Sequence, residues 1–231
     1  MNKLLKLLEK RIKITFINKK IVENVFIHRS FLNEHKHSEF PSNEKLEFLG
    51  DSVLSLITSI YLYKNFPLLD EGTYTDIKAS VVRTESLAEV GKKLDLGMIV
   101  LLSKGEELNG GRENKNILAD CFEAFIAAIF IDKGFDVAYT FIVEWLFKGK
   151  LDYIVKNKLY LSPKSRLQEY IQAKYRKLPI YTTQEEKGPE HKKEFLVSVN
   201  FDSEFLGQGK GSSKKEAEEA AAKNALEKLK E

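Results

Sequence analysis

The chain has 231 residues, of which 43% are hydrophobic and 31% are charged. This balance is typical of a folded globular protein and excludes a disordered chain, and the length allows one large domain or two ordinary ones. A net charge of +3 is compatible with a nucleic-acid partner without requiring one. The placement of charged residues along the chain therefore has to decide the class of partner.

Cys121 is the only cysteine in the sequence, which excludes an intramolecular disulfide bond. Its apolar neighbours predict a small buried side chain rather than a nucleophile. Residues 1–8 contain too many lysines to form the core of a signal peptide. The most apolar stretch, residues 52–63, is shorter than the ~20 residues that a membrane-spanning helix needs. We expect a cytoplasmic protein that does not enter a membrane.

Apolar residues recur at helical spacing over the first two-thirds of the chain, where the alternation typical of strands is scarce. We predict a mainly α-helical domain over residues 1–155. Its helices are expected at residues 4–8, 46–57, 74–94, 117–133 and 137–147.

The helical pattern weakens at residues 156–162, ahead of Pro163, and we predict a linker there. Beyond it the pattern indicates a second domain over residues 163–231 with the element order α-β-β-β-α. The expected elements are a helix at residues 166–175, strands at residues 179–184, 194–200 and 204–209, and a final helix that Ser212 or Ser213 caps.

Two of the predicted helices carry acids at a regular spacing. Glu47 and Asp51 lie one turn apart on a common face, and Glu44 lies one turn before Glu47. On the second helix, Asp120 and Glu123 are neighbours at spacing i, i+3. Such spacings usually mark a helix face in water, so the surrounding residues decide what the acids do.

Those surroundings are apolar. Asp120 and Glu123 interrupt an almost wholly apolar run, and Glu47 stands between Leu46 and Phe48. Isolated ionised carboxylates are costly to bury, so we expect cations to neutralise them, and carboxylate oxygens suit Mg²⁺ or Mn²⁺. His35 and His37 form only an isolated pair without the spacing of zinc ligands, and we expect no metal role for them.

Gly50 lies inside the first acidic helix, where a glycine costs about 1 kcal/mol relative to alanine. Its presence predicts a close approach by a neighbouring helix or by a ligand. Packing of a second helix would by itself explain it.

Residues 43–54, Asn-Glu-Lys-Leu-Glu-Phe-Leu-Gly-Asp-Ser-Val-Leu, closely resemble the signature segment of the ribonuclease III family. The resemblance extends to His28-Arg29-Ser30, to Asp70-Glu71-Gly72, and to Ile117-Leu118-Ala119-Asp120 with Glu123. The second predicted domain resembles a double-stranded-RNA-binding domain, in the order that bacterial members of the family use. Together these matches cover nearly the whole chain.

The resemblance implies an all-helical ribonuclease III nuclease domain whose four catalytic carboxylates are Glu47, Asp51, Asp120 and Glu123. Glu47, Asp120 and Glu123 are expected to hold Mg²⁺, with Mn²⁺ able to replace it, and no other small-molecule cofactor is implied. The metal would provide an attacking hydroxide, which Asp51 would orient or deprotonate. Glu44 and Glu71 match further acidic positions of the cleft, and Arg29 is expected to be a structural partner of one acid.

The resemblance further implies a homodimer in which each subunit supplies one cleft. Paired cuts in double-stranded RNA would leave 5′-phosphate and 3′-hydroxyl ends with short 3′ overhangs, and precursors of ribosomal RNA and other structured transcripts are the implied substrates. The apolar surface around Phe48 and Leu49 is a candidate dimer contact. Packing in the core of one subunit would explain the same residues, and the sequence leaves that choice open.

The second domain, counted from Ser162, holds fourteen lysines and arginines against twelve acids, so its net charge of +2 does not identify an RNA-binding protein. Lys214 and Lys215 lie in the first turn of the last predicted helix, where their charges and the free N–H groups form a phosphate-binding end. The resemblance assigns these lysines to phosphates across a major groove, and Gln168, Glu169, Gln172 and His191 to minor grooves.

One position departs from the RNA-binding pattern: Glu218 stands where some relatives carry a basic residue. Two alternatives to an active enzyme also stay open. One is a non-cleaving double-stranded-RNA-binding protein on the same scaffold, and the other is a structural or ribosome-associated protein with a degenerate nuclease domain. Retention of all four carboxylates argues against both.

Overall fold

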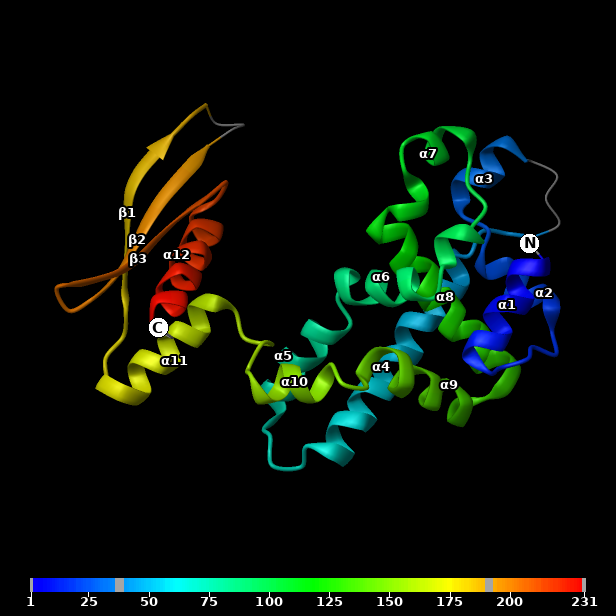
Figure 1. Cartoon of the computed structure of the whole chain (residues 1–231), viewed down its shortest axis with the longest axis horizontal. Coiled ribbons are helices and arrows are strands. Elements are labelled where there is room, and N and C mark those ends of the chain that lie inside the picture. The colour runs from blue at the N-terminus through cyan, green and yellow to red at the C-terminus, as the bar shows by residue number, and fades with distance from the viewer. Residues whose placement is uncertain (1, 36–39, 190–192, 230–231) are drawn as a thin grey trace. The chain divides into compact units, whose positions relative to one another are not determined.

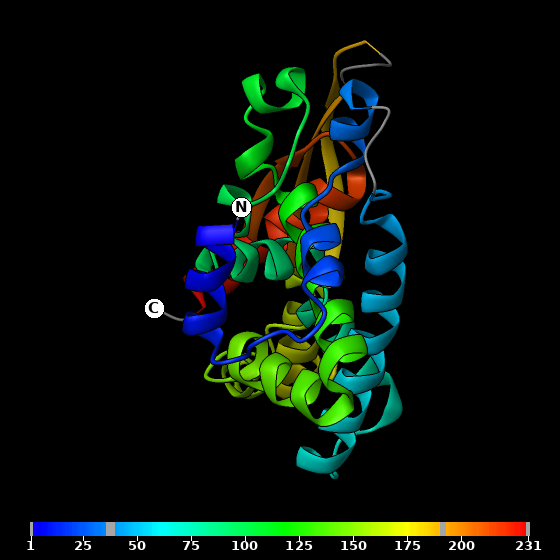
Figure 2. The same cartoon turned by 90° about the vertical axis from the view of Figure 1, so that its right-hand side faces the viewer.

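The computed structural model describes residues 2–35, 40–189 and 193–229 (Figure 1 and Figure 2). The chain divides into two compact units, Met1–Lys156 and Asn157–Glu231. The first unit is helical, and the second contains a three-stranded sheet with helices before and after it. The predicted fold class is confirmed.

Several helices of the N-terminal unit begin at a polar side chain that caps them. Asp70 accepts a hydrogen bond from the backbone N–H of Thr73, and Asn114 accepts from the backbone N–H of Asn116. The α-helices are α1 (Asn2–Ile12), α2 (Lys19–Val25), α3 (Arg29–Glu34), α4 (Glu44–Asn65), α5 (Glu71–Val81), α6 (Thr84–Lys93), α7 (Lys104–Leu108), α8 (Lys115–Lys133), α9 (Phe135–Ile142) and α10 (Leu151–Lys156). Two short 3-10 helices, η1 (Leu96–Met98) and η2 (Gly111–Glu113), and a π-helical segment, η3 (Val143–Phe147), complete the unit.

α8 forms the centre of this unit and packs against α2, α4, α6 and α9 (Figure 1). Eleven of its nineteen residues are buried, which explains its nearly continuous apolar sequence. Phe125 on α8 contacts three other aromatic rings, those of Phe16, Phe26 and Phe141, at centroid distances of 5.7, 6.2 and 5.7 Å. Cys121 is buried on the same helix, as expected.

The single helix predicted at residues 74–94 is wrong. The structure has two helices there, because Arg83, at the residue before α6, adopts an extended backbone conformation with φ −66° and ψ 152°. No glycine or proline marks the break, so the apolar spacing continues through it in the sequence.

α4 presents a partly exposed apolar surface. Its 22 residues are long and apolar enough, by length and composition, to cross a membrane, a test that core helices of soluble proteins also pass. Leu54, Ile57 and Leu62 are buried against the rest of the unit, whereas Phe48 is 78% exposed. Core packing therefore does not account for Phe48.

The C-terminal unit comprises α11 (Pro163–Tyr175), β1 (Ile180–Lys187), β2 (Glu194–Phe201), β3 (Glu204–Gly211) and α12 (Lys214–Lys228). The strands are antiparallel in the order β1-β2-β3, and α12 lies against β2 and β3 (Figure 1). A Cβ added to Gly209 on β3 would lie 2.2 Å from the backbone nitrogen of Ala221 on α12. Glycines on the strand and alanines on the helix thus allow the two backbones to approach closely.

Candidate active site

Three carboxylates meet where α4 crosses α8. Glu47 comes from α4, and Asp120 and Glu123 come from successive turns of α8. Each offers one oxygen, and these oxygens all lie within 4.8 Å of one another. All three side chains are half-buried, in agreement with the apolar residues that surround them in the sequence.

Gly50 allows this meeting of the helices. A Cβ at this position would lie 1.9 Å from the backbone carbonyl oxygen of Glu123. Of the two explanations for this glycine, close packing of a neighbouring helix is therefore confirmed. The same close approach brings Glu47, one turn before Gly50, next to the acids of α8.

The electrostatics of the cluster oppose the simultaneous ionisation of its acids. Burial raises the pKa of Glu123 to about 8, with further contributions from the negative charges of Asp51, Glu47 and Asp120. Burial also raises the pKa of Glu47 and of Asp120, and the charge of Asp120 adds to the shift at Glu47. Two full charges 4.8 Å apart, the limit within which these oxygens lie, repel by roughly 3 kcal/mol at an effective dielectric constant of about 20.

This donor set fits a hard divalent cation. Three carboxylate oxygens from two rigid helices are the ligands that Mg²⁺ and Mn²⁺ prefer, and a cation would relieve the repulsion among them. Among the described residues, the group that could hold a metal ion consists of Glu47, Asp120 and Glu123 and includes no Cys or His. The chemistry of the site therefore favours a metal with oxygen ligands over zinc.

Of the other predicted acids, Asp51 and Glu44 lie near this cluster and Glu71 does not. Asp51 is exposed one turn beyond Glu47, near enough for its charge to act on Glu123. Glu44 is exposed at the start of α4, where Ser42 Oγ donates to it at 2.6 Å. Glu71, by contrast, lines a separate small pocket with Tyr74 and Lys78, so the structure does not bring it to the cluster within one chain.

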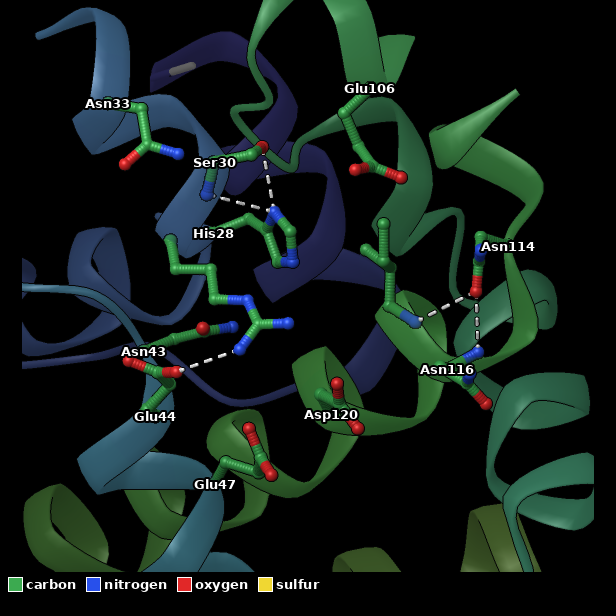
Figure 3. A pocket seen from close by; sticks show the side chains of 12 residues that line it. His28, Ser30, Asn33, Asn43, Glu44, Glu47, Glu106, Asn114, Asn116 and Asp120 are labelled. Atoms are coloured by element: carbon green, nitrogen blue, oxygen red, sulfur yellow. Dashed lines mark hydrogen bonds and ion pairs between the residues drawn. The ribbon is translucent and has the colours of Figure 1, made fainter. Parts of the chain in front are cut away.

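An open pocket of about 640 Å³ extends from Glu47 and Asp120 (Figure 3). Arg29 lines it and lies 3.7 Å from Glu44, with its side chain 74% exposed. Ion pairs in such exposed settings contribute little stability, so Arg29 is at most a weak structural partner of an acid. Polar residues to which no role was assigned from the sequence also line the pocket, namely His28, Ser30, Asn33, Asn43, Glu106, Asn114 and Asn116.

Asn43 illustrates what sequence analysis missed. Its buried side chain donates from Nδ2 to the carbonyl oxygen of Val25 at 3.0 Å, which ties the start of α4 to α2. The signal was present, because Asn43 begins the segment that resembles the family signature. A partner eighteen residues away could not be assigned without the fold.

In the C-terminal unit, those predicted RNA-binding residues that the structure describes are exposed. Lys214 and Lys215 occupy the first turn of α12, and Ser213 caps this helix by accepting from the backbone N–H of Glu216. Gln168, Glu169 and Gln172 are exposed on α11, with Glu169 paired to Lys158 at 2.5 Å. His191 and the neighbouring Glu190, like His37 in the N-terminal unit, lie outside the described residues.

Glu218, the departure from the family pattern, has a defined partner. Its Oε2 lies 2.5 Å from Nζ of Lys164 on α11, and the same Nζ lies 4.8 Å from the ring centroid of Tyr181. Glu218 on α12 therefore pairs with a lysine that would otherwise be available to a ligand at the surface of the unit.

Comparisons with known proteins agree with this architecture. A family model described as ribonuclease-III-like matches residues 18–150, and one described as a double-stranded RNA binding motif matches residues 163–229. A protein named Ribonuclease 3 from Clostridium acetobutylicum is 44% identical, over 98% of this chain and 97% of its own. Another of that name from Chloroflexus aurantiacus is 42% identical, over 95% of this chain and 89% of its own.

Among solved structures, the nuclease domain of ribonuclease III from Campylobacter jejuni matches with a TM-score of 0.57 and 36% identity, over 62% of this chain and 96% of that domain. The fold, the acids between α4 and α8, and the matched models define a nuclease of the ribonuclease-III-like class with a double-stranded-RNA-binding domain.

The chain belongs to the ribonuclease III family. It is accordingly an endoribonuclease specific for double-stranded RNA.

Proposed function

We propose that this endoribonuclease hydrolyses phosphodiester bonds with a divalent metal ion held by Glu47, Asp120 and Glu123. The observation that carries the proposal is the meeting of these three carboxylates within 4.8 Å between two packed helices. A bound cation would neutralise charge on the scissile phosphate and lower the pKa of a water. Mg²⁺ is the proposed ion, and Mn²⁺ is expected to replace it because it also takes oxygen ligands.

Asp51 is proposed to orient the attacking water or to take up its proton. Its exposed position at the edge of the cluster supports this role, because a water there would be within reach of both the acid and an incoming strand. Glu44 is proposed as an additional acid of the RNA cleft. Glu71 would serve the same cleft only if another subunit brought it there, since it lines a different pocket in this chain.

We further propose a homodimer in which each subunit supplies one cleft. Phe48, Leu56 and Tyr63 recur on α4 and are 78%, 54% and 74% exposed, and such exposed apolar rows mark interaction sites. The related Campylobacter jejuni domain has a region involved in dimer formation. Two clefts acting on opposite strands would leave 5′-phosphate and 3′-hydroxyl ends with short 3′ overhangs.

In the second domain, Lys214 and Lys215 are proposed to contact phosphates across a major groove. Gln168, Glu169 and Gln172 are proposed to face one minor groove, and His191 the next, so that the domain responds to the shape of an A-form duplex. The exposure of the five described residues supports this assignment. Ribosomal RNA precursors and other structured transcripts are the proposed substrates, in the cytoplasm.

Cleavage of a long, perfect RNA duplex with Mg²⁺ tests this function, with a gel-shift assay for binding. Glu123→Gln is expected to lower the cleavage rate by about a thousandfold or more and to leave affinity nearly unchanged, because it removes a metal ligand and no RNA contact. Glu144→Gln, at an exposed acid paired with Lys148, is the matched control and should cleave normally. A wild type that binds but never cuts with Mg²⁺ or Mn²⁺ would establish the non-cleaving alternative.

Sedimentation tests the dimer separately. Wild type is expected to sediment as a dimer at micromolar concentration, and Phe48→Glu as a monomer, because a charge there would be desolvated at the interface. Ile17→Glu, at another exposed apolar residue of the same unit, serves as the control. A monomeric wild type would contradict the dimer.

A further inference from the structure

His28 and Arg29 line the same pocket as Glu47 and Asp120, two of the three proposed metal-binding acids, and no part of the proposed mechanism uses them. Among the described residues that line this pocket, Arg29 is the sole permanently charged cation. It faces four acids, which are Glu44, Glu47, Glu106 and Asp120. An RNA strand is a polyanion, so the groups that receive its phosphates in such a pocket have to be cations or hydrogen-bond donors.

Arg29 is available for this task. Its contact with Glu44 is 3.7 Å long, beyond hydrogen-bond distance, and 74% of its side chain is exposed. A guanidinium carries five N–H donors in a planar arrangement that matches phosphate oxygens. The weak contact with one carboxylate leaves most of these donors to a ligand.

His28 presents a donor of defined orientation. The backbone N–H of Ser30 donates to His28 Nδ1 at 3.2 Å, and Ser30 Oγ lies 2.8 Å from the same nitrogen (Figure 3). The backbone N–H of Ser103 donates in turn to Ser30 Oγ at 3.0 Å, so the hydroxyl proton of Ser30 is directed to His28. Because Nδ1 accepts, the proton of the neutral imidazole resides on Nε2.

Burial favours that neutral form. It lowers the pKa of His28 below its ordinary value, although the charge of Glu106 acts in the opposite direction. A neutral imidazole with the proton on Nε2 is a hydrogen-bond donor at that atom. Ser30, which is itself buried, and Ser103 hold the ring in this state.

We propose that His28 and Arg29 together form a binding site for one RNA phosphate, the phosphodiester adjacent to the bond that is cut. Arg29 would contact its charged oxygens, and Nε2–H of His28 would donate to one of them. Ser30 and Ser103 act as positioning residues through His28. The inference rests on the proposed function for the location of the cut bond, but the phosphate contact can be tested without cleavage.

The test uses a short duplex substrate in which one phosphate at a time is replaced by an uncharged methylphosphonate. For the full-length wild type, affinity should fall about tenfold when the contacted phosphate is neutralised, as expected for loss of a charge-assisted hydrogen bond. Arg29→Gln should lose about the same factor on the unmodified duplex. It should then lose clearly less than wild type at that one position, because the contact with Arg29 is already absent and only that with His28 is left.

Two control variants sharpen this test. Arg83→Gln removes an exposed arginine with a comparable 3.9 Å ion pair outside the pocket, and it should respond to every methylphosphonate as wild type does. Arg29→Lys keeps the charge and should retain part of the response. If the losses from Arg29→Gln and from every methylphosphonate are additive, the site does not exist. If one methylphosphonate position is coupled to Arg29→Gln but the wild type cannot cleave, the phosphate site is upheld and the proposed function is refuted.

The state of His28 has its own readout in the ¹⁵N shifts of its imidazole. Wild type should show an unprotonated Nδ1 and a protonated Nε2, and Ser30→Ala should shift the population toward the other tautomer. The same variant should weaken the response to the methylphosphonate at the contacted position while leaving the other positions unchanged. A protonated Nδ1 in wild type would overturn the assignment of His28 as a donor.

Discussion

In the N-terminal domain three carboxylates are half-buried between packed helices, whereas in the C-terminal domain the lysines proposed to bind RNA are exposed on the first turn of α12. The first arrangement shifts pKa values and fixes distances through the approach of two backbones. The second leaves both side chains exposed to water. Changes in the first domain should therefore alter stability and chemistry together, and changes on the surface of the second should alter affinity alone.

The largest expected effect comes from Gly50→Ala, which tests the coupling of stability and chemistry. The new Cβ would lie 1.9 Å from the carbonyl oxygen of Glu123, and two helix backbones would have to separate. We expect the free energy of unfolding to fall by about 3 kcal/mol or more and the cleavage rate to fall with it.

Denaturant unfolding and single-turnover cleavage measure the two quantities on the same samples. Gly105→Ala on α7 is the matched control, because nothing lies within 4 Å of its added Cβ. It should change stability by at most about 1 kcal/mol, in the stabilising direction. If Gly50→Ala were as stable as the wild type, this result would contradict the close approach of the two helices.

The pH dependence of stability without metal should show a smaller effect of the same origin. The pKa of Glu123 is about 8 in the folded chain and near 4.5 when unfolded. Between these values the folded state binds more protons, so stability falls as pH rises from about 4.5 to 8. Allowing for solvent screening of a half-buried group, the loss is roughly 2 kcal/mol.

Thermal unfolding from pH 5 to pH 8.5 in the presence of a chelator measures this loss. Glu123→Gln cannot ionise, so it should be more stable than wild type at pH 8 and should show a flatter profile. Mg²⁺ should raise the stability of wild type at pH 8 more than that of the variant. Parallel profiles for the two proteins would refute the raised pKa.

The half-buried positions of Glu47, Asp120 and Glu123 could be expected from the sequence because these acids lie within apolar runs, whereas their meeting was implied by the resemblance to the family. The helices that carry them were predictable for the same reason, since their apolar spacing is long and regular. In the second domain, alternating strands and an alanine-rich last helix indicated the element order. These features depend on residues close together in the chain.

Features that depend on distant contacts were not predictable. Ser103 donates to Ser30 across 73 positions, so the orientation of His28 depends on a contact that no local pattern indicates. Arg29 was expected to support an acid, but exposure leaves that ion pair weak. The helix break at Arg83 lacks any glycine or proline, so the apolar spacing gave no signal for it.

The surface of the second domain should respond through affinity alone. Lys214→Ala with Lys215→Ala is expected to weaken duplex binding about tenfold for all sequences and to reduce the salt dependence by about two phosphate contacts. Lys223→Ala with Lys228→Ala removes the same charge from later turns of α12 and is the control. A salt titration by fluorescence anisotropy measures both. Unchanged affinity in the first variant, or an equal loss in the control, would contradict the assignment.

The smallest effect is expected from Glu218→Lys, which tests whether this acid limits RNA binding. Glu218 lies one turn after Lys214 and holds Lys164 at 2.5 Å, so the change both adds a cation near the proposed phosphate contacts and releases a second one. We expect affinity to rise about threefold and its salt dependence to steepen, because more phosphates are neutralised.

Glu227→Lys makes the same charge change at the far end of α12, and an equal gain in affinity there would indicate an effect of net charge rather than of position. Stability should fall by less than about 1 kcal/mol, since ion pairs between partly exposed side chains contribute little. A gain in affinity without a matching loss of stability would show that this surface, unlike the carboxylate cluster, can be retuned one side chain at a time.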